Sequence, residues 1–435
     1  MSSEPSENPS YRDAIEFLYD LRLFGAKFGL ENTFKLAALA GNPHHRLRFI
    51  HVAGTNGKGS TCAMLESIYR ATGLRVGLFT SPHLVSFRER IQVNRTLIDE
   101  DEVVRLLDRI RPLFDEFPAD HRPTFFEAVT IMAMLHFAQQ RCDLVIWETG
   151  LGGRLDATNI VTPLASIITN INIEHSELLG DTVEKIAAEK AGIIKDRVPV
   201  ITGATPGGGL DVIARVAAEK QAMLTLVAES DNRKPPLDTL PLALHGPHQR
   251  ANAALAIAAA RVLNAGLPVN DASMRAGLAG VFWPGRLQRI DLAGGRTILL
   301  DGAHNPAGAA ALRVALEAEH PGARPTLVFG VFRDKDSAAM CQSLAPLARR
   351  LLLVPVHAER TEDPERLVGA CRLANPGAAV ETCASLGEAL DLAARDKFVV
   401  VAGSLYLVGE AMELLHLAIA PPRDEKALNE WKNRN

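Results

Sequence analysis

Cysteine is scarce and scattered in this chain of 435 residues. There are five cysteines, and no two of them are arranged as Cys-x-x-Cys. A disulfide framework or a cysteine zinc site would require closely patterned cysteines, so neither is expected. The odd number and the wide spacing instead indicate reduced thiols in a cytoplasmic protein.

Excess positive charge and long apolar runs are also missing. The net charge of −4 and the pI near 6.4 give no electrostatic reason to expect a nucleic-acid partner. The alanine-rich stretch 251–263 is too short to span a bilayer and suits a buried helix better. The first residues, MSSEPSENPSYRDAIEF, contain neither a basic nor an apolar segment, so we expect no secretory signal and no membrane partner.

Short apolar segments rich in β-branched residues alternate with helical patterns, which predicts an α/β fold with parallel sheets. In the first part of the chain these segments are FIHVAG, RVGLFTS, LVIWETG, ASIITNI and VPVITG. Polar residues follow four of them, at 54–60, 80–83, 148–154 and 170–175. Ligands of open α/β sheets bind beyond the carboxyl ends of the strands, so the four polar runs predict one shared site.

A break in this alternation occurs in FWPGRLQRIDLAGGR, where Pro284, Gly285 and the pair Gly294 and Gly295 interrupt it. The alternation then restarts with TILLDGAHNP, TLVFGVFRDKD, RRLLLVPVHA and FVVVAGSLYLVGE. A chain of this length is also too long for one ordinary core. We therefore predict one domain over 1–290 and a second, smaller α/β domain over 291–435.

The segment HVAGTNGKGST has the parts of a phosphate-binding loop in an unusual spacing. The pattern G-x-x-x-x-G-K-[ST] requires glycine where this chain has Val52, and Gly59 displaces the hydroxyl residue by one place. Glycines allow backbone N–H groups to converge on one anion, and a following helix N-terminus favours phosphate. Lys58 would contact phosphate oxygens, and Ser60 or Thr61 a magnesium ion. The alternative is a glycine-rich turn that only joins a strand to a helix.

Five motifs together resemble the folylpolyglutamate synthase and dihydrofolate synthase family, within the wider group of Mur ligases. They are AGTNGKGS, TSPHL, ETGLGGRLDATN, EKAGI and DGAHNP, and the resemblance covers nearly the whole chain. The shifted serine is that group's own form of the loop. The resemblance implies a P-loop ATPase domain followed by a Rossmann-like domain. It also implies an ATP-binding loop made of Gly54, Thr55, Asn56, Gly57, Lys58, Gly59, Ser60 and Thr61.

The activity that the resemblance implies is ATP-dependent amide formation in folate biosynthesis and one-carbon metabolism. L-Glutamate would be joined to dihydropteroate, or to the γ-carboxylate of a reduced folate, through an acyl phosphate. Which of the two acceptors is used stays open. The implied cofactor is Mg²⁺, and we expect a monomer.

Magnesium ligands are expected near the loop. Glu148 ends an apolar strand, and a carboxylate there suits Mg²⁺, although it could instead cap a helix or form an ion pair. The resemblance implies that Ser60, Ser81 and His175 also serve the metal. For His175 only the resemblance favours this role, because imidazole is not the usual magnesium ligand. The family usually has Asp-His where this chain has Glu174 and His175.

Further ATP contacts are implied outside the loop. In GPHQRANAALAIAAA the resemblance makes Asn252 a nucleotide contact. It makes Asp301 another and places His304 close to it, although DGAHNP would also serve as a strand-to-helix turn. Arg286, in WPGRLQ, is expected to reach phosphates, and its alternative is a salt bridge in the linker.

The acceptor site is implied by three segments. TFFEAVTIMAML aligns with the pteroate-binding segment of the family, although aromatic pairs at helix starts are more often part of a core. The segments LDA and GAKF are the other two. The acceptor residues implied are Gly25, Ala26, Lys27, Phe28, Thr124, Phe125, Phe126, Glu127, Leu155, Asp156 and Ala157.

Lys190 lies in TVEKIAAEKAGIIKD, where helical periodicity places it on the same face as Ile186. From the residues alone it is a solvated helix lysine. The resemblance implies instead that it is carbamylated by carbon dioxide and, with Lys58 and His175, catalytic. Carbamylation requires the neutral amine, so we expect Lys190 in a partly desolvated pocket that lowers its pKa.

Two other functions remain open. A cell-wall amino-acid ligase of the same group would carry a nucleotide-sugar-binding domain before the loop, and the 53 residues that precede Gly54 are too few for one. A regulator that binds ATP without ligating anything would form no product. Mass spectrometry of a folate pool after incubation separates that regulator from a ligase.

Overall fold

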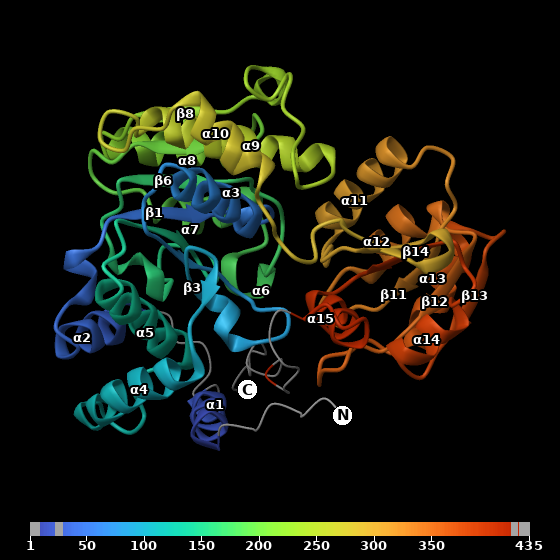
Figure 1. The fold of residues 1–435 in the computed structure, drawn as a ribbon, viewed down its shortest axis with the longest axis horizontal. Coiled ribbons are helices and arrows are strands. Elements are labelled where there is room, and N and C mark those ends of the chain that lie inside the picture. Colours follow the sequence, from blue (N-terminus) through green and yellow to red (C-terminus); the bar gives the residue numbers. More distant parts are fainter. Residues whose placement is uncertain (1–8, 22–28, 419–424, 426–435) are drawn as a thin grey trace. The chain divides into compact units, whose positions relative to one another are not determined.

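The computed structural model describes residues 9–21, 29–418 and 425, and the chain forms two compact units (Figure 1). Unit 1 comprises Met1–Pro241, Ala251–Val281 and Glu425–Asn435. Unit 2 comprises Leu242–Arg250 and Phe282–Asp424. The chain therefore passes from unit 1 to unit 2 more than once.

Unit 1 is built on an eight-stranded sheet in the order β4-β3-β2-β5-β1-β6-β7-β8. The six strands from β2 to β8 in this order are parallel, whereas β3 and β4 are antiparallel to their neighbours. The five segments predicted as strands form β1, β2, β5, β6 and β7, which confirms them. The strands are β1 (Phe49–Ala53), β2 (Val76–Phe79), β3 (Ile91–Val93), β4 (Thr96–Leu97), β5 (Leu144–Glu148), β6 (Ala165–Ile168), β7 (Val200–Thr202) and β8 (Leu224–Leu226).

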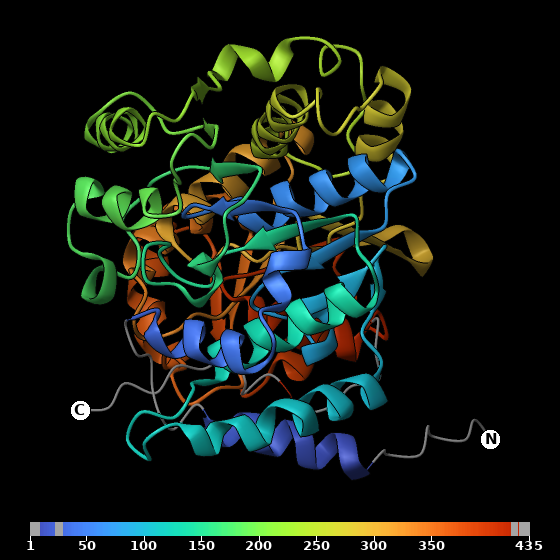
Figure 2. The ribbon, with the colours of Figure 1, turned by 90° about the vertical axis from the view of Figure 1, so that its left-hand side faces the viewer.

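Helices cover both faces of this sheet, and Figures 1 and 2 show α3 and α5 on opposite faces. On the α5 side, the Trp147 ring stacks on Phe79 with 4.5 Å between centroids. The α-helices are α1 (Pro9–Leu21), α2 (Glu31–Leu39), α3 (Lys58–Ala71), α4 (Glu100–Ile110), α5 (Phe125–Gln139), α6 (Ser176–Leu179), α7 (Val183–Ala191), α8 (Gly208–Glu219), α9 (Pro247–Val262) and α10 (Asp271–Ala279). Short 3-10 turns are η2 (Pro43–Arg46), η3 (Phe87–Arg90), η4 (Arg111–Glu116), η5 (Ala157–Ile160) and η6 (Glu229–Arg233).

Unit 2 has a six-stranded sheet in the order β13-β12-β11-β14-β10-β9, parallel except for β9. One face of its strands packs on α11, α12 and α13. The strands are β9 (Gln288–Leu292), β10 (Arg296–Leu300), β11 (Thr326–Phe329), β12 (Arg350–Leu353), β13 (Ala379–Thr382) and β14 (Phe398–Ala402). The helices are α11 (Pro306–Glu319), α12 (Ser337–Leu344), α13 (Pro364–Ala374), α14 (Leu386–Leu392) and α15 (Leu405–Leu414), with 3-10 turns η7 (Ala293–Gly295) and η8 (Ala345–Leu347).

The two units do not follow the expected division between residues 290 and 291. Strand β9 crosses that position and pairs with β10 along its length, so unit 2 starts earlier, at Phe282. Residues 242–250, which were assigned to the first domain, also belong to unit 2. The division at 290 relied on Pro and Gly punctuation, which does not show with which sheet an edge strand pairs.

The alanine-rich stretch 251–263 forms most of α9, and its alanines are largely buried, as expected of a buried helix. Across the described ranges, every helix is too short or too polar to cross a membrane. All five cysteines are buried free thiols.

Candidate active site

The phosphate-binding loop connects β1 to α3, and two of its glycines have backbone conformations that disfavour a side chain. Gly54 has φ 148°, and a Cβ there would lie 1.8 Å from the hydroxyl oxygen of Thr169. Gly57 has φ 81°, and a Cβ there would lie 2.3 Å from Oδ1 of Asn252. The glycines therefore allow the close approach of Thr169, just after β6, and of Asn252 on α9. The contact with Gly57 places Asn252, one of the expected ATP residues, directly against the loop.

The segment after β6 holds the loop in shape. The backbone N–H of Thr55 donates to the Asn170 carbonyl at 3.0 Å, and that of Asn56 donates to Oδ1 of Asn170 at 2.9 Å. Thr169 donates its hydroxyl to the Asn56 carbonyl at 2.6 Å, and the Thr55 hydroxyl contacts the backbone of Asn172. The sequence marked this segment only as a polar run after a strand. Its role in shaping the loop depends on β6 lying beside β1.

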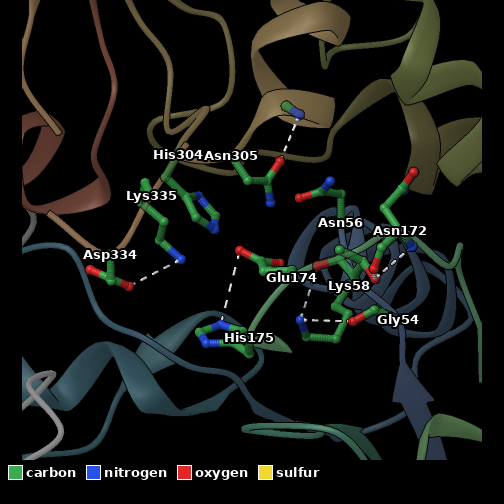
Figure 3. A network of polar contacts seen from close by, with 12 residues as sticks. Gly54, Asn56, Lys58, Asn172, Glu174, His175, His304, Asn305, Asp334 and Lys335 are labelled. Atoms are coloured by element: carbon green, nitrogen blue, oxygen red, sulfur yellow. Dashed lines mark hydrogen bonds and ion pairs between the residues drawn. The ribbon is translucent and has the colours of Figure 1, made fainter. Parts of the chain in front are cut away.

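Two lysine amines meet at one carbonyl of the loop. Lys58, the first residue of α3, donates to the Gly54 carbonyl at 3.2 Å (Figure 3), and Lys190 on α7 donates to the same oxygen at 3.0 Å. Lys190 is only 4% exposed, so the interpretation of a solvated helix lysine is wrong. Burial, and then the nearby Lys58 charge, lower the pKa of Lys190 to about 7.

Glu148 lies at the end of β5, next to β1. Its backbone pairs with Val52, and its Oε2 accepts a hydrogen bond from the Ser81 backbone N–H at 2.9 Å. Both Glu148 and Ser60 are buried. The Thr61 hydroxyl is also buried and has no hydrogen-bond partner within the described ranges. This end of the sheet therefore gathers buried oxygen atoms beside the phosphate loop.

His175 precedes α6 with φ 51°, and its side chain is 40% exposed. Its Nε2 lies 3.9 Å from Oε1 of Glu174 (Figure 3). The acidic side chain of Glu174 is itself mostly buried. The substitution of Glu for the usual Asp thus keeps a carboxylate in contact with the histidine.

The expected acceptor residues on α5 form the start of that helix. Thr124 and Glu127 make a capping box, in which Glu127 Oε2 accepts the Thr124 N–H at 2.8 Å. The other oxygen, Oε1, accepts the Thr33 hydroxyl at 3.1 Å. Phe125 is buried, whereas the partly buried Phe126 ring lies against Gly150 and leaves no room for a Cβ there. Glu127 is therefore engaged in local structure.

Asp156, in the expected segment Leu155, Asp156 and Ala157, is 7% exposed and caps η5. Its carboxylate accepts the Leu151 N–H at 2.8 Å and both the N–H and the hydroxyl of Thr158. Burial raises the pKa of Asp156. The remaining expected acceptor residues, Gly25, Ala26, Lys27 and Phe28, lie outside the described residues.

Unit 2 brings together its own three expected ATP residues. Asp301 follows β10, and its carboxylate accepts the N–H groups of Leu287 and Ala303, both at 2.9 Å. Arg286 lies against Gly302: a Cβ added to Gly302 would be 2.3 Å from Nη1 of Arg286. His304 donates from Nδ1 to the Gly302 carbonyl at 2.8 Å.

His248, in unit 2, was not expected as a site residue. Burial lowers its pKa, and Asp301 and Arg286 are the charged groups that act on it most strongly. The only signal in the sequence was its place in the motif GPHQRAN, which was interpreted through Asn252 alone.

Two family models match the chain. Residues 52–205 match the Mur ligase middle domain, and residues 285–405 match the Mur ligase, glutamate ligase domain. The two matches fall on the phosphate loop with its sheet and on most of unit 2.

Curated relatives include the dihydrofolate synthase/folylpolyglutamate synthase of Bacillus subtilis, 34% identical over 93% of this chain and 99% of the relative. The Escherichia coli protein of the same description is also 34% identical, over 92% of this chain and 94% of the relative. A probable bifunctional folylpolyglutamate synthase/dihydropteroate synthase of Haloferax volcanii is 37% identical over 94% of this chain. The chain spans about half the length, 51%, of that relative.

Solved structures of proteins with similar descriptions also resemble this chain. Escherichia coli FolC in complex with DHPP and ADP superimposes with a TM-score of 0.83 and 32% identity, over 95% of this chain and 99% of that one. The Mycobacterium tuberculosis folylpolyglutamate synthase complexed with ADP has a TM-score of 0.84 and 29% identity, over 95% and 100%. By its motifs, its fold and these relatives, the chain belongs to the folylpolyglutamate synthase and dihydrofolate synthase family of ATP-dependent Mur-type ligases.

Proposed function

We propose that this chain uses ATP to add L-glutamate to dihydropteroate, to the γ-carboxylate of reduced folates, or to both. The observation that carries the proposal is the convergence of Lys58 and the buried Lys190 on the Gly54 carbonyl of a glycine-rich loop. A turn that only joined a strand to a helix would not need two amines beside it. A neutral Lys190 can share the carbonyl with the Lys58 cation without repulsion.

The residues beside the loop fit a magnesium ion. Mg²⁺ prefers oxygen ligands and commonly bridges phosphates. Glu148, Ser60 and the Thr61 hydroxyl, which has no hydrogen-bond partner among the described residues, are buried oxygen ligands there. Within the described residues no three His, Cys, Asp or Glu side chains cluster as a metal site, so phosphate oxygens and hydroxyls would complete the coordination. Ser81 and His175 are the further candidate ligands. When bound, the ion would offset the negative charge of the phosphates.

The residues of the chain would act by electrostatic stabilisation of phosphoryl transfer. A carboxylate is a poor electrophile, and transfer of the γ-phosphoryl group to it gives an acyl phosphate that the glutamate amine attacks. Lys58 and the N–H groups at the start of α3 would stabilise the charge that moves during this transfer. We assign Asn252, Arg286, Asp301 and His304 to ATP.

For the acceptor we propose Phe125 and Phe126 as ring contacts. Thr124, Glu127 and Asp156 shape the segments around those rings through the hydrogen bonds that they make within the chain. The flanking residues Leu155 and Ala157 and the segment 25–28 remain proposed acceptor contacts.

Lys190 is proposed to be carbamylated. A neutral amine adds CO₂ and releases a proton, which gives an anionic carbamate in place of a cation. A pKa near 7 leaves a large neutral fraction at physiological pH, and this supports the proposal. The carbamate oxygens would lie near the phosphates and could support Mg²⁺.

The five buried thiols support a cytoplasmic location, and we propose that the protein acts as a monomer.

The decisive experiment compares dihydropteroate and a reduced folate as acceptors, with phosphate release and mass spectrometry of the products. Phosphate release that requires both glutamate and an acceptor is expected. Binding of ATP without any glutamylated product would instead identify an ATP-binding regulator.

A further inference from the structure

Glu425 returns to unit 1 after the whole of unit 2 has been traversed in sequence, and it is 2% exposed. Its Oε2 accepts the hydroxyl of Ser86 at 3.1 Å and the backbone N–H of Phe87. Its carbonyl accepts a hydrogen bond from His83 Nε2 at 3.0 Å. Glu425 thus binds a segment that begins within the TSPHL motif, at His83.

This segment, 83–90, is shaped by carboxylates. Glu89 accepts the N–H groups of Leu84 at 2.8 Å, Val85 at 2.9 Å and Ser86 at 2.8 Å. The next N–H group, that of Phe87, goes to Glu425. Four consecutive buried N–H groups are therefore satisfied by two carboxylates, of which one is supplied from a distant part of the chain. Removing that carboxylate would leave a buried donor without its acceptor.

The same contacts determine the protonation and the tautomer of His83. The Arg90 guanidinium can only donate, so its 2.9 Å hydrogen bond makes Nδ1 of His83 the acceptor. A carbonyl can only accept, so Nε2 carries the proton towards Glu425. His83 is thus a neutral imidazole that links Arg90 to Glu425, and all three residues are buried.

The segment adjoins the proposed acceptor residues. The Phe87 ring packs edge-on against Phe125 at 6.4 Å, and the Arg90 guanidinium lies over the same ring at 5.3 Å. Just before the segment, Ser81 is bound to Glu148. A shift of the segment would therefore change the environment of Phe125 more directly than that of the phosphate loop.

We propose that Glu425 is a positioning residue for the acceptor site, and that its carboxylate holds Phe87 and Arg90 against Phe125 through segment 83–90. The proposal rests on the assignment of Phe125 to the acceptor. Substituting the side chain isolates the carboxylate, because the contact between His83 and the Glu425 carbonyl belongs to the backbone.

The kinetic test is Glu425→Ala. Loss of this acceptor is expected to raise the KM for dihydropteroate or folate about tenfold, with less than about a twofold change in the KM for ATP. Excess acetate should bind in the vacated space and lower the acceptor KM again. An unchanged acceptor KM, an equal rise in the KM for ATP, or no response to acetate would overturn the proposal.

Two further variants complete the kinetic test. Glu425→Gln keeps the volume and one acceptor oxygen, so we expect a smaller rise in the acceptor KM; it also replaces the alanine variant if that variant does not fold. Glu16→Ala is the control, because Glu16 is 68% exposed on α1 and pairs there with Arg12. It should leave both KM values unchanged.

Hydrogen exchange tests the same contact without any activity. In Glu425→Ala the amide of Phe87 should exchange faster, and acetate should slow it, while Leu84, Val85 and Ser86 stay protected by Glu89. Unchanged exchange at Phe87 would show that Glu425 does not hold the segment. If the wild-type protein ligated no glutamate, the proposed function would fail, and this measurement would still decide whether the anchor exists.

Discussion

The predicted phosphate loop and the proposed acceptor segment at the start of α5 use their buried polar groups in different ways. In the loop, two amines share the Gly54 carbonyl, and the Thr61 hydroxyl has no partner among the described residues. At the start of α5, by contrast, both oxygens of Glu127 accept hydrogen bonds from within the chain. The loop therefore presents polar groups to a charged ligand. In the α5 segment, by contrast, the polar groups are used in hydrogen bonds that stabilise the segment itself.

This difference shows that residues assigned to a site by the same family resemblance can act either on a ligand or on the local structure. A lysine such as Lys58 contributes little to packing and can act on phosphate. A carboxylate such as Glu127 or Asp156 can support the same site by fixing a helix start or a turn. Substitutions in the loop should therefore reduce activity before stability, and substitutions of Glu127 or Asp156 should reduce stability first.

The largest effect is expected for Lys58→Ala. Loss of a charge that stabilises phosphoryl transfer should lower kcat on the order of 100-fold or more, while the melting temperature stays near that of the wild type. Lys185→Ala is the control, because that lysine is exposed and pairs with Asp181. Unaltered turnover of Lys58→Ala would contradict the phosphate assignment.

Lys190→Ala should lose most of the activity, and a small carboxylate such as acetate should partly restore it by replacing the carbamate. Steady-state rates with and without acetate measure this. Lys190→Arg keeps a positive charge and cannot form the carbamate, so it should stay inactive. Full activity of the arginine variant would refute carbamylation.

Gly57→Ala tests the approach of Asn252 to the loop. The added Cβ would lie 2.3 Å from Oδ1 of Asn252, so the KM for ATP should rise about tenfold, or ~1.4 kcal/mol. Gly73→Ala is the matched control, because Gly73 also has a positive φ, 90°, but no atom in the described part of the chain lies within 4 Å of its Cβ position. It should lose about 1 kcal/mol of stability and keep its KM for ATP. Equal KM values in the two variants would count against the contact.

Glu127→Ala addresses the acceptor side of the comparison. Loss of the cap and of the buried acceptor for Thr33 should reduce the free energy of unfolding by about 2 kcal/mol. Thr124→Ser keeps the capping hydroxyl and should remain near the wild-type stability. Denaturant unfolding gives both values. A variant of normal stability with a greatly raised acceptor KM would show instead that Glu127 contacts the acceptor directly.

The smallest effect is a pH dependence of stability from Lys190. Its pKa is about 7 in the folded chain, against 10.5 for a lysine exposed to water, so between these pH values only the unfolded chain holds the proton. The folded chain therefore binds fewer protons than the unfolded chain in this window, so raising the pH favours the folded chain, by at most about 1.4 kcal/mol per pH unit. The stability of the wild type relative to Lys190→Ala should accordingly increase with pH across the window and become constant below pH 7. Unfolding curves in CO₂-free buffer measure it, and parallel curves across the window would contradict the burial of a titrating amine.

Much of the fold follows from local patterns. The apolar segments that became β1, β5 and β10 are short, β-branched and followed by polar turns, so each identifies itself without its neighbours. The short strands β3, β4 and β9 were not identified. They have two to five residues, and β9 alternates half-buried with exposed positions, so only pairing with an adjacent strand makes each of them a strand.

The sequence by itself determined the α/β class, the glycine-rich loop and the family, because these depend on residues that are close together in the chain. The tertiary structure alone decided which polar groups meet. Lys190 is 136 positions from Gly54 and Glu425 is 338 positions from Phe87, and no local pattern encodes either contact. Burial is likewise a property of the packed molecule: it turns a helix lysine into an amine with a pKa near 7, because the charged form loses its hydration when α7 packs beside the loop.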